Sequence, residues 1–394
     1  MNEVVIVAGV RTAVGAFGKS LRDMPAAEMG RQLLTGIMER TSLSRQEIDE
    51  VIFGHGYVHG GGLNSARISS QLAGFPSTVP AYIVIKACGS GLKAITNAAL
   101  AIAAGQQDII VAGGVESMSN VPYLVKNRWG NHFGHIQMED ALLADGLTCS
   151  LGHEHMGMTG ERLAEQYGIT REEQDQFAFE SHCKAIEAVR NGKFAQEIVP
   201  LEVKERKGTH IFAQDESIRQ DISLERLGTL PAAFKQVGTI TAGNACPMND
   251  GAAALILMSD TKAQQHGMKP LLKVKAFASV GVDANVMGIG PVPAIRKALN
   301  KAGLTLEDIG LIELNEAFAA QALAVIRELD LNPARVNVNG GAIALGHPVG
   351  ATGAKLTVTL MHEMLRSGVK YGMVSLCMAG GMGIAVIYEN VSTM

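Results

Sequence analysis

Short runs of apolar, mostly β-branched residues alternate along the chain with longer stretches in which apolar positions recur every three or four residues. Runs of this length are typical of buried strands, and the longer stretches are typical of helices with one apolar face. The runs lie at residues 4–9, 51–56, 109–114, 254–260, 311–314, 373–376 and 384–389. Their alternation with helical stretches predicts an α/β protein with largely buried strands.

Two parts of the chain show the same order of motifs. In the first, LSRQEIDEVIFGHG is followed by an apolar run, a glycine-rich turn at Cys88, a helical stretch and DIIVAGG. In the second, LTLEDIGLIELNEAF is followed by a glycine-rich apolar run, a turn at His347, a helical stretch and GMVSLCMAGG. This order predicts two similar halves, related by a pseudo-twofold axis, with both strand-to-helix turns facing one site.

The segment between these halves is richer in polar residues. It includes a helical pattern whose start is marked by a capping box formed by Thr170 and Glu173. We expect an inserted loop domain here that acts as a lid over the substrate. The predicted division of the chain is a first half, an insertion and a second half, at residues 1–119 plus 249–270, 120–248 and 271–394.

Composition and charge narrow the class of protein. The formal net charge is −4 and no basic run occurs, which argues against nucleic acid as a partner. Five scattered cysteines favour a reducing compartment over a disulfide framework. The first residues lead into an apolar run without the pattern of a secretory signal, and no stretch is long and apolar enough to span a bilayer. We therefore expect a cytoplasmic protein that does not bind membranes.

The first candidate for chemistry is Cys88, which stands between YIVIKA and GSGLKA. A thiol just before a helix feels the positive end of the helix dipole and nearby backbone N–H groups, which favour the thiolate. Gly89 and Gly91 leave room for a bulky acyl group. The sequence therefore predicts a nucleophile here, and the alternative is a small structural cysteine buried at a glycine turn.

Other residues suit the same reaction. His347, in GHPVG, also precedes a predicted helix, and a histidine beside a thiol is the usual group that activates it. Cys377 is followed by Ala379 and several glycines, so a second thiol and backbone N–H groups can surround one point. Asn315 and Glu316 end another predicted strand and can supply a polar group to the same face. The alternatives are a structural histidine and a buried strand-end cysteine.

Two other interpretations of the motifs explain less of the sequence. GSGLKA, with Glu116 after the next predicted strand, is similar to a dinucleotide fingerprint. That interpretation lacks the usual early position in the chain and leaves Cys88, His347 and Cys377 without a role. No metal site is expected, because no fourth ligand with suitable spacing accompanies the candidate histidines, His153, His155 and His182.

With these residues in place, the chain resembles the thiolases, and among them the acetyl-CoA acetyltransferases, nearly from end to end. The resemblance rests on CGSGLKA, GGVESMS, HMGMT, GTITAGNA, NDGAAAL, NEAFAAQ, GGAIALGHPVGATGA and SLCMAGGMG. It implies a duplicated α/β thiolase fold, layered αβαβα, with an inserted loop domain. It also implies a homodimer or a homotetramer.

The resemblance implies a mechanism for condensing two molecules of acetyl-CoA into acetoacetyl-CoA and CoA. Cys88 would attack acetyl-CoA while His347 accepts its proton, and Cys377 would remove an α-proton from the second acetyl-CoA. The enolate oxygen would be held by His347 and a water bound to Asn315, and the thioester oxygen by the N–H groups of Cys88 and Ala379. The family takes CoA as a substrate and needs no metal or redox cofactor. Cys88 and Cys377 in one site would also be open to mild oxidation to a disulfide.

The resemblance further carries over positions that contact CoA or line the acyl pocket. Those on the CoA side are Arg219, Phe234, Ala242 and Cys246. Those along the acyl and pantetheine pocket are Leu147, His155, Met287 and Phe318. Of these, His155 favours the short-chain class of the family.

The chain departs from the family's usual pattern at three places. Ala379 stands where glycine is usual, and an alanine would be strained if this position required a positive φ. Cys246 and Pro247 replace a common serine–glycine pair, and Lys86 and Ala87 precede the nucleophile where other residues are usual. Two alternatives to the acetyltransferase therefore remain: a degradative 3-ketoacyl-CoA thiolase for longer chains, and a CoA-binding protein with impaired catalysis.

Overall fold

The computed structural model describes residues 2–206 and 208–392, and one mixed sheet of eleven strands runs through them. From edge to edge its main path is β13 (Leu311–Leu314), β14 (Tyr371–Met378), β15 (Met382–Asn390), β12 (Leu272–Gly281), β1 (Val4–Thr12), β11 (Asn249–Ser259), β5 (Ile109–Ser117), β3 (Glu50–Gly54) and β4 (Ala81–Val84). The short strands β2 (Gly15–Ala16) and β8 (Ile198–Val199) pair with β11 and β1. The seven apolar runs given above by residue range all fall on this path.

The sheet is built from two similar halves that meet in its middle. β1 and β12 are joined there by two antiparallel residue pairs, Val5 with Lys273 and Ile6 with Leu272. On each side follow two antiparallel strands and then a parallel one, in the order β11, β5, β3 and β15, β14, β13. The predicted duplicated α/β fold is therefore confirmed.

The second half differs from the first in the segment before His347, where the sequence predicted a strand. The first half has β4 there, whereas the second half has a single bridge from Val336 to β13. The chain then runs through the short helix α10 (Ala342–Leu345). Gly340 and Gly346 have φ values of +82° and +89°, and these conformations interrupt an extended strand.

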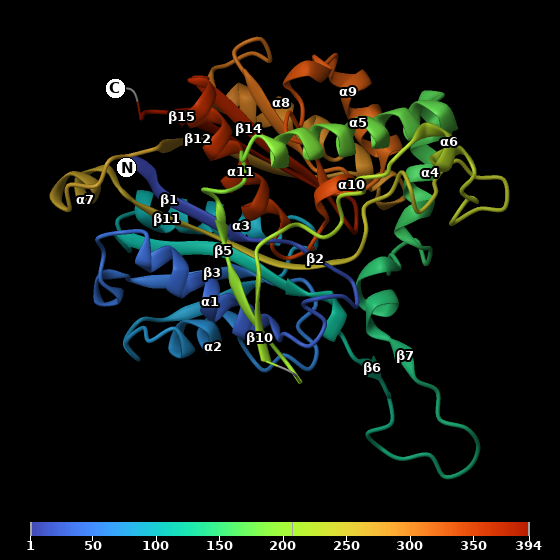
Figure 1. Cartoon of the computed structure of the whole chain (residues 1–394), viewed down its shortest axis with the longest axis horizontal. Coiled ribbons are helices and arrows are strands. Elements are labelled where there is room, and N and C mark those ends of the chain that lie inside the picture. The colour runs from blue at the N-terminus through green and yellow to red at the C-terminus, as the bar shows by residue number, and fades with distance from the viewer. Residues whose placement is uncertain (1, 207, 393–394) are drawn as a thin grey trace.

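Helices and sheet form five layers (Figure 1). Two helices cover the outer face of the first half, α1 (Ala26–Glu39) and α2 (Ser65–Leu72). Two cover that of the second half, α8 (Pro291–Ala302) and α9 (Ala319–Leu329). Two lie between the halves and share one core with strands of both, α3 (Ser90–Ala103) and α11 (Thr352–Ser367). This order confirms the predicted αβαβα layering.

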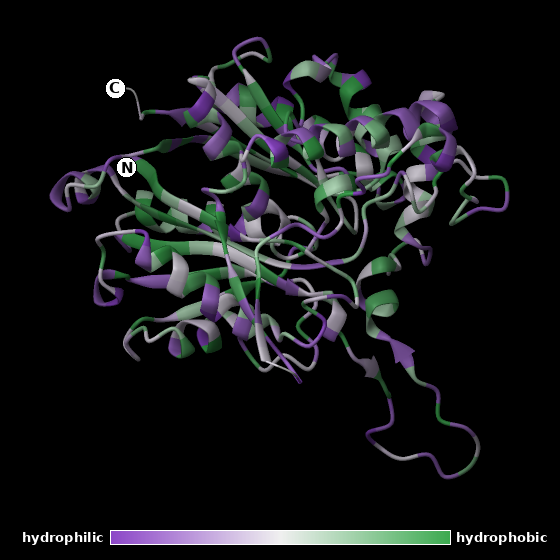
Figure 2. Ribbon diagram, viewed as in Figure 1, coloured by the Kyte–Doolittle hydropathy of each residue, from purple (hydrophilic) through white to green (hydrophobic). Residues whose placement is uncertain are grey.

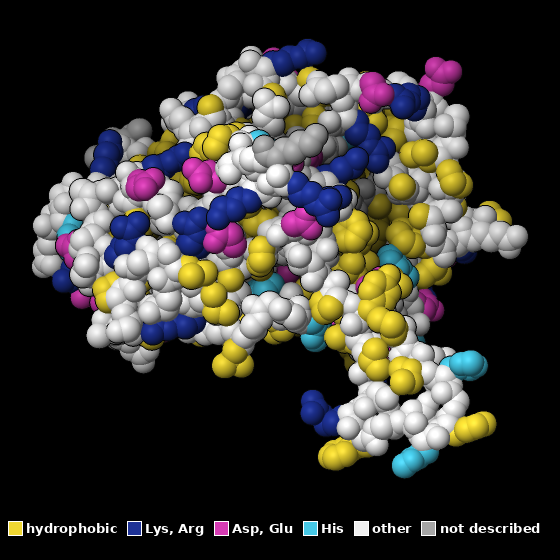
Figure 3. All heavy atoms as spheres, turned by 60° about the horizontal axis from the view of Figure 1, so that its bottom comes forward, with side chains coloured by type: hydrophobic (Ala, Val, Ile, Leu, Met, Phe, Trp, Pro, Cys, Tyr) yellow, Lys and Arg dark blue, Asp and Glu magenta, His cyan; other side chains and the backbone are white. Residues whose placement is uncertain are grey.

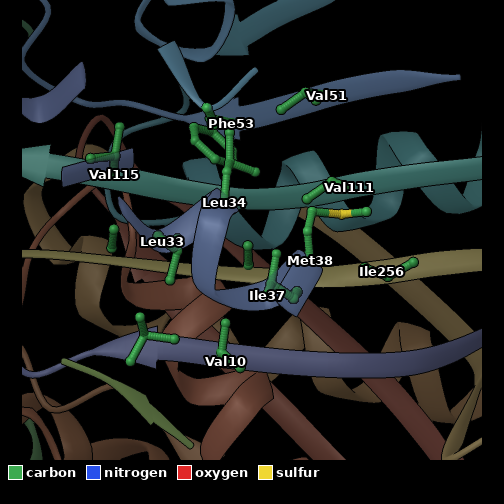
Figure 4. Close-up of a cluster of buried hydrophobic side chains, with 14 of the residues drawn as sticks. Val10, Leu33, Leu34, Ile37, Met38, Val51, Phe53, Val111, Val115 and Ile256 are labelled. Carbon is green, nitrogen blue, oxygen red and sulfur yellow. The ribbon is translucent and has the colours of Figure 1, made fainter. Parts of the chain in front are cut away.

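The hydrophobic cluster between α1 and the strands of the first half shows how helix periodicity produces these layers (Figure 4). Leu33, Leu34 and Ile37 are buried along one face of α1. They share a hydrophobic cluster with Val111 and Val115 of β5. Figure 2 shows the same pattern in the whole molecule, with mostly hydrophobic strands inside and polar positions on the exposed helix faces. Burial of apolar area at about 25 cal/mol per Å² is the main force that stabilises these contacts.

The chain between β5 and β11 supplies a further set of elements. They are β6 (Tyr123–Leu124), β7 (Glu139–Asp140), a π-helical turn (Leu143–Leu147), α4 (Met156–Tyr167), α5 (Arg171–Arg190), β9 (Leu201–Glu205), β10 (Gly208–Phe212) and α6 (Leu224–Gly228). The predicted capping box starts α5, because Thr170 Oγ1 accepts the N–H of Glu173 at 3.2 Å and Glu173 Oε2 accepts that of Thr170 at 2.8 Å. A 3-10 turn at Met118–Asn120 directly follows β5. Outside this segment, the described residues also form α7 (Asp260–Gln265) and the 3-10 turns Arg45–Glu47, Ala284–Ile289 and Pro333–Arg335.

An arm between β6 and β7 stands clear of the body of the molecule (Figures 1 and 3). Its large apolar side chains are exposed to solvent, with Trp129 at 91% and Phe133 at 97% of their full accessibility. None of the helices in residues 2–206 and 208–392 has the length and apolar character needed to cross a membrane. The arm therefore carries two of the four most exposed large apolar side chains of the described surface, and the other two are Leu63 and Val237.

Candidate active site

A cavity of about 300 Å³ lies where the two halves meet the chain between β5 and β11. Cys88 of the first half and His347 and Ala379 of the second half all lie on its wall. The structure thus brings together three predicted residues that are far apart in the sequence. Four more predicted residues line the same cavity, Leu147, Cys246, Met287 and Phe318.

Cys88 sits in a tight turn between β4 and α3. Ser90 donates its backbone N–H to the carbonyl of Ala87 at 3.0 Å, and Ala87 has a φ of 46°. This left-handed conformation costs a residue with a side chain on the order of 1 kcal/mol. In the first turn of α3, a Cβ at Gly91 would lie 2.8 Å from the carbonyl oxygen of Gly350, so the helix meets the His347 segment backbone to backbone. Strain and close packing therefore fix the position of the thiol.

Burial raises the pKa of the Cys88 thiol to about 11. The N–H groups of Ala379 and of Cys88 itself act against this rise, and the Glu116 carboxylate adds to it. The nearby N–H groups favour the thiolate as expected, but the expectation of a thiolate in the free site is wrong, because loss of solvation outweighs these N–H groups. Cys88 is a thiol at neutral pH and needs a base to become a nucleophile.

His347 presents a ring nitrogen that can accept a proton. Its Nδ1 lies 2.7 Å from Oγ1 of Thr352, and that hydroxyl donates to the carbonyl of Pro348 at 2.8 Å. Since the hydroxyl hydrogen is used in the second bond, Nδ1 must donate in the first, and Nε2 is left as an acceptor. Nε2 is buried without a hydrogen-bond partner in the described part of the chain. Burial, and then Lys355, lower the pKa of His347 to about 3, so the imidazole is neutral at physiological pH.

Two buried side chains that the sequence analysis missed hold the backbone at His347. Asn249 Oδ1 accepts the N–H of His347 at 2.8 Å. Lys355 Nζ donates to the carbonyl of Gly346 at 2.7 Å. A lysine in the apolar pattern of a buried helix was a readable signal, since a buried ammonium group needs a polar partner. The ring and the backbone of His347 are thus both held in place.

Cys377 lies just behind the cavity wall, at the end of β14. It is fully buried and pairs with Gly383 across the hairpin to β15. Burial raises the pKa of its thiol well above the usual range, and the thiols of Cys88 and Cys246 add to the effect. Three free thiols therefore lie close enough to interact electrostatically around one site.

The turn after Cys377 accommodates Ala379, the residue that stands where glycine is usual in the family, without backbone strain. Gly380 and Gly381 have φ values of +80° and +78°, whereas Ala379 is not among the residues with a positive φ. The strain expected for alanine at this position is therefore absent. Its N–H group acts on the Cys88 thiol, as an oxyanion hole between the two residues requires.

Asn315 and its neighbour Glu316 directly follow β13 but have different surroundings. Both polar atoms of the Asn315 side chain are buried and lack a hydrogen-bond partner within the described ranges. The Glu316 carboxylate instead accepts hydrogen bonds from Ser181 Oγ (2.8 Å), Asn337 Nδ2 (2.8 Å) and the N–H of Ile343 (3.1 Å). The expectation that Glu316 serves the same face as Asn315 is wrong, because these three donors bind the Glu316 carboxylate and Glu316 lines a different cavity.

Four of the residues predicted to contact CoA or the acyl group do not line the cavity. His155 caps α4, since its Nδ1 accepts the N–H of Gly157 at 3.0 Å, and its ring stacks on Phe234 with centroids 4.5 Å apart. Phe234 in turn meets Phe318 edge-on at 6.0 Å. The remaining two residues, Arg219 and Ala242, contact each other, because an Nη of Arg219 donates to the carbonyl of Ala242 at 3.3 Å.

The cavity wall also contains residues that the sequence analysis did not select. They are chiefly Tyr57, Cys149, Met156 and Val349. Cys149 is one of the scattered cysteines, Met156 adjoins the predicted residue His155, and Val349 lies two residues after His347. Tyr57 gave no signal, since it follows the strand β3 in a loop whose path the sequence does not reveal.

Comparisons with known proteins agree over the whole chain. Residues 4–261 match the family model described as the thiolase N-terminal domain, and residues 268–390 match the thiolase C-terminal domain. A protein of Staphylococcus aureus called a probable acetyl-CoA acyltransferase is 50% identical, over 99% of this chain and all of that one.

Solved structures give the same result. The Bacillus anthracis acetyl-CoA acetyltransferase is 46% identical with a TM-score of 0.98, and the match covers 99% of both chains. The human mitochondrial 3-ketoacyl-CoA thiolase in complex with CoA is 41% identical with a TM-score of 0.95, and the match covers 99% of this chain and 98% of that one. The sheet order, the cavity and these matches together establish that the chain belongs to the thiolase family.

Proposed function

We propose that the protein is an acetyl-CoA C-acetyltransferase, which reversibly condenses two molecules of acetyl-CoA to acetoacetyl-CoA and CoA. The observation that carries the proposal is one cavity shared by the Cys88 thiol, His347 and Ala379. A thiol and a neutral imidazole on one wall suit acyl transfer through a covalent thioester. The names of the Staphylococcus and Bacillus relatives support acetyl-CoA as the substrate.

The first half-reaction forms an acetyl-enzyme. The Cys88 sulfur attacks the thioester carbon of acetyl-CoA while its proton moves to Nε2 of His347. The carbonyl oxygen becomes an oxyanion held by the N–H groups of Cys88 and Ala379, both of which act on the Cys88 sulfur in the free site. The bond to CoA then breaks, and the CoA thiolate leaves with the proton of Cys377. The enzyme now holds acetyl-Cys88, a cationic His347 and an anionic Cys377.

The second half-reaction forms the carbon–carbon bond. The Cys377 thiolate removes an α-proton from a second acetyl-CoA, and the enolate oxygen is stabilised by N–H donation from His347 and by a water on Asn315. The unpaired amide of Asn315 supports this role, because a buried amide needs a partner. The enolate carbon attacks acetyl-Cys88, acetoacetyl-CoA is released, and the Cys88 sulfur takes back its proton from His347.

A second candidate function is that of a degradative 3-ketoacyl-CoA thiolase acting on longer chains. The likeness to the human 3-ketoacyl-CoA thiolase favours it. CoA-dependent cleavage of acetoacetyl-CoA beside a C8 3-ketoacyl-CoA separates the two candidates. We expect the higher kcat/KM on acetoacetyl-CoA, and a preference for the C8 substrate would make the second candidate the better one. The specificity ratio measures the difference in transition-state binding between the two chains.

A CoA-binding protein with impaired catalysis is the remaining alternative. It was motivated by Ala379, and the unstrained backbone there removes most of its support. It predicts that CoA binds and that neither 3-ketoacyl-CoA is cleaved. In that outcome, Ala379→Gly would be the first variant to assay.

We further propose that residues 120–248 form an inserted domain that contacts CoA. The stack of His155 on Phe234 and the contact between Arg219 and Ala242 support this placement, because both lie in that segment. We also propose a cytoplasmic location, from the scattered cysteines, all of which are free thiols. A homodimer or homotetramer is proposed as well, and the exposed apolar arm supports it.

A further inference from the structure

Glu116 is a buried carboxylate to which the mechanism above assigns no role. It lies near the end of β5. Its Oε2 accepts the N–H of Gly350 at 2.8 Å and that of Gly56 at 2.9 Å, and its Oε1 accepts the N–H of Tyr57 at 3.1 Å. Gly350 follows His347 in the second half, whereas Gly56 and Tyr57 follow β3 in the first half and line the cavity. One carboxylate therefore joins the backbone of both halves at the edge of the site.

Glycines surround this junction because no other residue fits there. A Cβ at Gly350 would lie 2.7 Å from the backbone N of Gly56. A Cβ at Gly114 would lie 2.2 Å from the carbonyl oxygen of Gly350, and one at Gly54 would lie 2.6 Å from the same atom. The two halves thus touch through bare backbone, and the Glu116 side chain is the polar group that binds N–H groups of both.

Burial raises the pKa of Glu116 to about 7, although its three N–H donors act against the rise, so the carboxylate is ionised above neutral pH. It then has no ionised partner close to it in the described residues. The nearest basic group is His55, whose Nε2 lies 3.4 Å from Oε1 and whose Nδ1 lies 2.9 Å from Ser65 Oγ. Burial lowers the pKa of His55 to about 4, so this ring is neutral at physiological pH. Packing alone does not explain an unbalanced buried carboxylate, because an apolar side chain would fill the same space without that cost.

We propose that Glu116 is a positioning residue, which holds the His347 segment of the second half at the distance from the Cys88 turn that proton transfer requires. Three backbone N–H groups on two loops fix the carboxylate, and the carboxylate in turn fixes the loops. The inference deepens the proposed function and rests on it for its kinetic consequence. The effect of the Glu116 charge on the reactivity of the Cys88 thiol does not depend on which reaction the enzyme catalyses.

The test compares Glu116→Gln with a matched control, Asp49→Asn, at a carboxylate that anchors the opposite end of the same strand, β5. Asp49 Oδ2 accepts the N–H groups of Asp108 and Ile109, both at 2.8 Å, at the end of β5 far from Glu116. We expect Glu116→Gln to lower kcat for acetoacetyl-CoA cleavage on the order of 10- to 100-fold, with KM changed by less than about threefold. Asp49→Asn removes a similar backbone anchor and should keep kcat within about twofold of the parent, whatever its effect on the melting temperature.

A second measurement separates the effect of the negative charge of Glu116 from the effect of its side-chain length. The rate at which iodoacetamide alkylates Cys88 is followed against pH, because the thiolate is the reactive form. Glu116→Gln removes a charge that opposes the thiolate, so the midpoint should move to lower pH. Glu116→Asp keeps the charge but is too short to reach both loops, so its midpoint should stay and its kcat should fall.

The titratable groups around Glu116 and Cys88 are the same in all variants. Those facing Glu116 are His55, Tyr57, Asp250 and Cys88. Besides Glu116 itself, those facing Cys88 are His347, Tyr57, Cys246 and Cys377. Kcat within about twofold of the parent in Glu116→Gln, or an equal loss in Asp49→Asn, would overturn the inference. If the parent enzyme does not cleave acetoacetyl-CoA, the proposed function fails, and an unshifted alkylation midpoint in Glu116→Gln would then overturn the inference on its own. Glu116→Asp serves for the kinetic arm if the Gln variant does not fold.

Discussion

The two catalytic thiols do different work, so their removal should stop the reaction at different stages. Cys88→Ala should lower turnover by at least about 10⁴-fold and leave no acetyl group on the protein, because no nucleophile remains. Cys377→Ala should block condensation to a similar extent but still acquire an acetyl group at Cys88. Mass spectrometry of the protein after acid quench, with labelled acetyl-CoA, distinguishes the two variants. Turnover that persists in Cys88→Ala would contradict the assignment of the nucleophile.

Thr352 sets which nitrogen of His347 is the acceptor. In Thr352→Val the ring loses the oxygen that accepts from Nδ1, so the neutral ring can place its proton on Nε2 instead. We expect kcat to fall by up to about 10²-fold, which is within the range that general acid–base catalysis contributes. Thr352→Ser keeps the hydroxyl and should restore most of the rate. Equal rates for the Val and Ser variants would show that the tautomer does not limit turnover.

Single residues also mark the limit of what the sequence could predict. Cys88 and His347 could be found, because each combines a reactive side chain with a glycine-rich turn before a helix. The direction of the Cys88 pKa shift could not, since it depends on how much solvent the folded chain removes. Asn315 and Glu316 are adjacent polar residues after one strand, and the sequence does not show which of them finds partners within the fold and which is left without one among the described residues.

The middle helices, α3 and α11, approach each other so closely at Gly353 that no side chain would fit at this position. A Cβ at Gly353 would lie 2.5 Å from the backbone N of Leu92, where no flexible side chain can give way. Gly353→Ala should therefore lower the free energy of unfolding by about 1–3 kcal/mol, as overpacking does elsewhere. Gly228→Ala on α6 is the matched control, because a Cβ there meets nothing within 4 Å. Urea unfolding of both variants gives the comparison, and equal stabilities would contradict the close contact.

α5 carries a buried histidine that should make this helix sensitive to acid. His182 Nδ1 accepts the N–H of Arg219 at 3.1 Å, and burial lowers the pKa of His182 to about 4. In the unfolded chain the pKa is about 6.5, so as the pH falls from 7 to 5 the unfolded chain binds a proton that the folded chain does not. The contribution of His182 to the free energy of unfolding should therefore fall by about 2 kcal/mol over this interval.

The measurement is urea unfolding of the parent and of His182→Gln at both pH values. The glutamine oxygen can still accept the N–H of Arg219 but does not titrate. The difference in stability between the two proteins should change by about 2 kcal/mol in favour of the variant at pH 5. A difference that does not depend on pH would mean that this histidine is already protonated, or solvated, in the folded protein.

At the level of elements, the sequence predicted the strands that are continuously apolar and missed those that are not. β12 carries Lys273 and Lys275 between its apolar residues, so it lacks the uninterrupted run of the other long strands. The segment before His347 gave the opposite error, because it was predicted as a strand and its apolar residues instead form a short helix between glycines. The hydrophobic pattern indicates which residues are buried, whereas the backbone conformation of the glycines decides whether this segment is a strand or a helix.

The arm predicts how whole molecules associate. Large apolar side chains at full exposure are costly unless another surface covers them. Light scattering should therefore give a mass of two or four chains of 41.6 kDa, and the double variant Trp129→Ser with Phe133→Ser should reduce it. Val237→Ser, at another exposed apolar position, is the control and should keep the mass of the parent. An unchanged mass in the arm variant would assign the association to another surface.

The shared middle layer has a consequence for how the chain can be divided. α11 belongs to the second half but packs on β11, β5 and β1 of the first, and α3 packs on both α11 and β15. Separated at the connection between α7 and β12, each half would expose the apolar face that the other covers. The two halves are therefore comparable to the subunits of an obligate dimer that have been fused into one polypeptide. Synthesis as a single chain guarantees that each half meets its partner, and gives the nucleophile and the base a fixed stoichiometry of one to one.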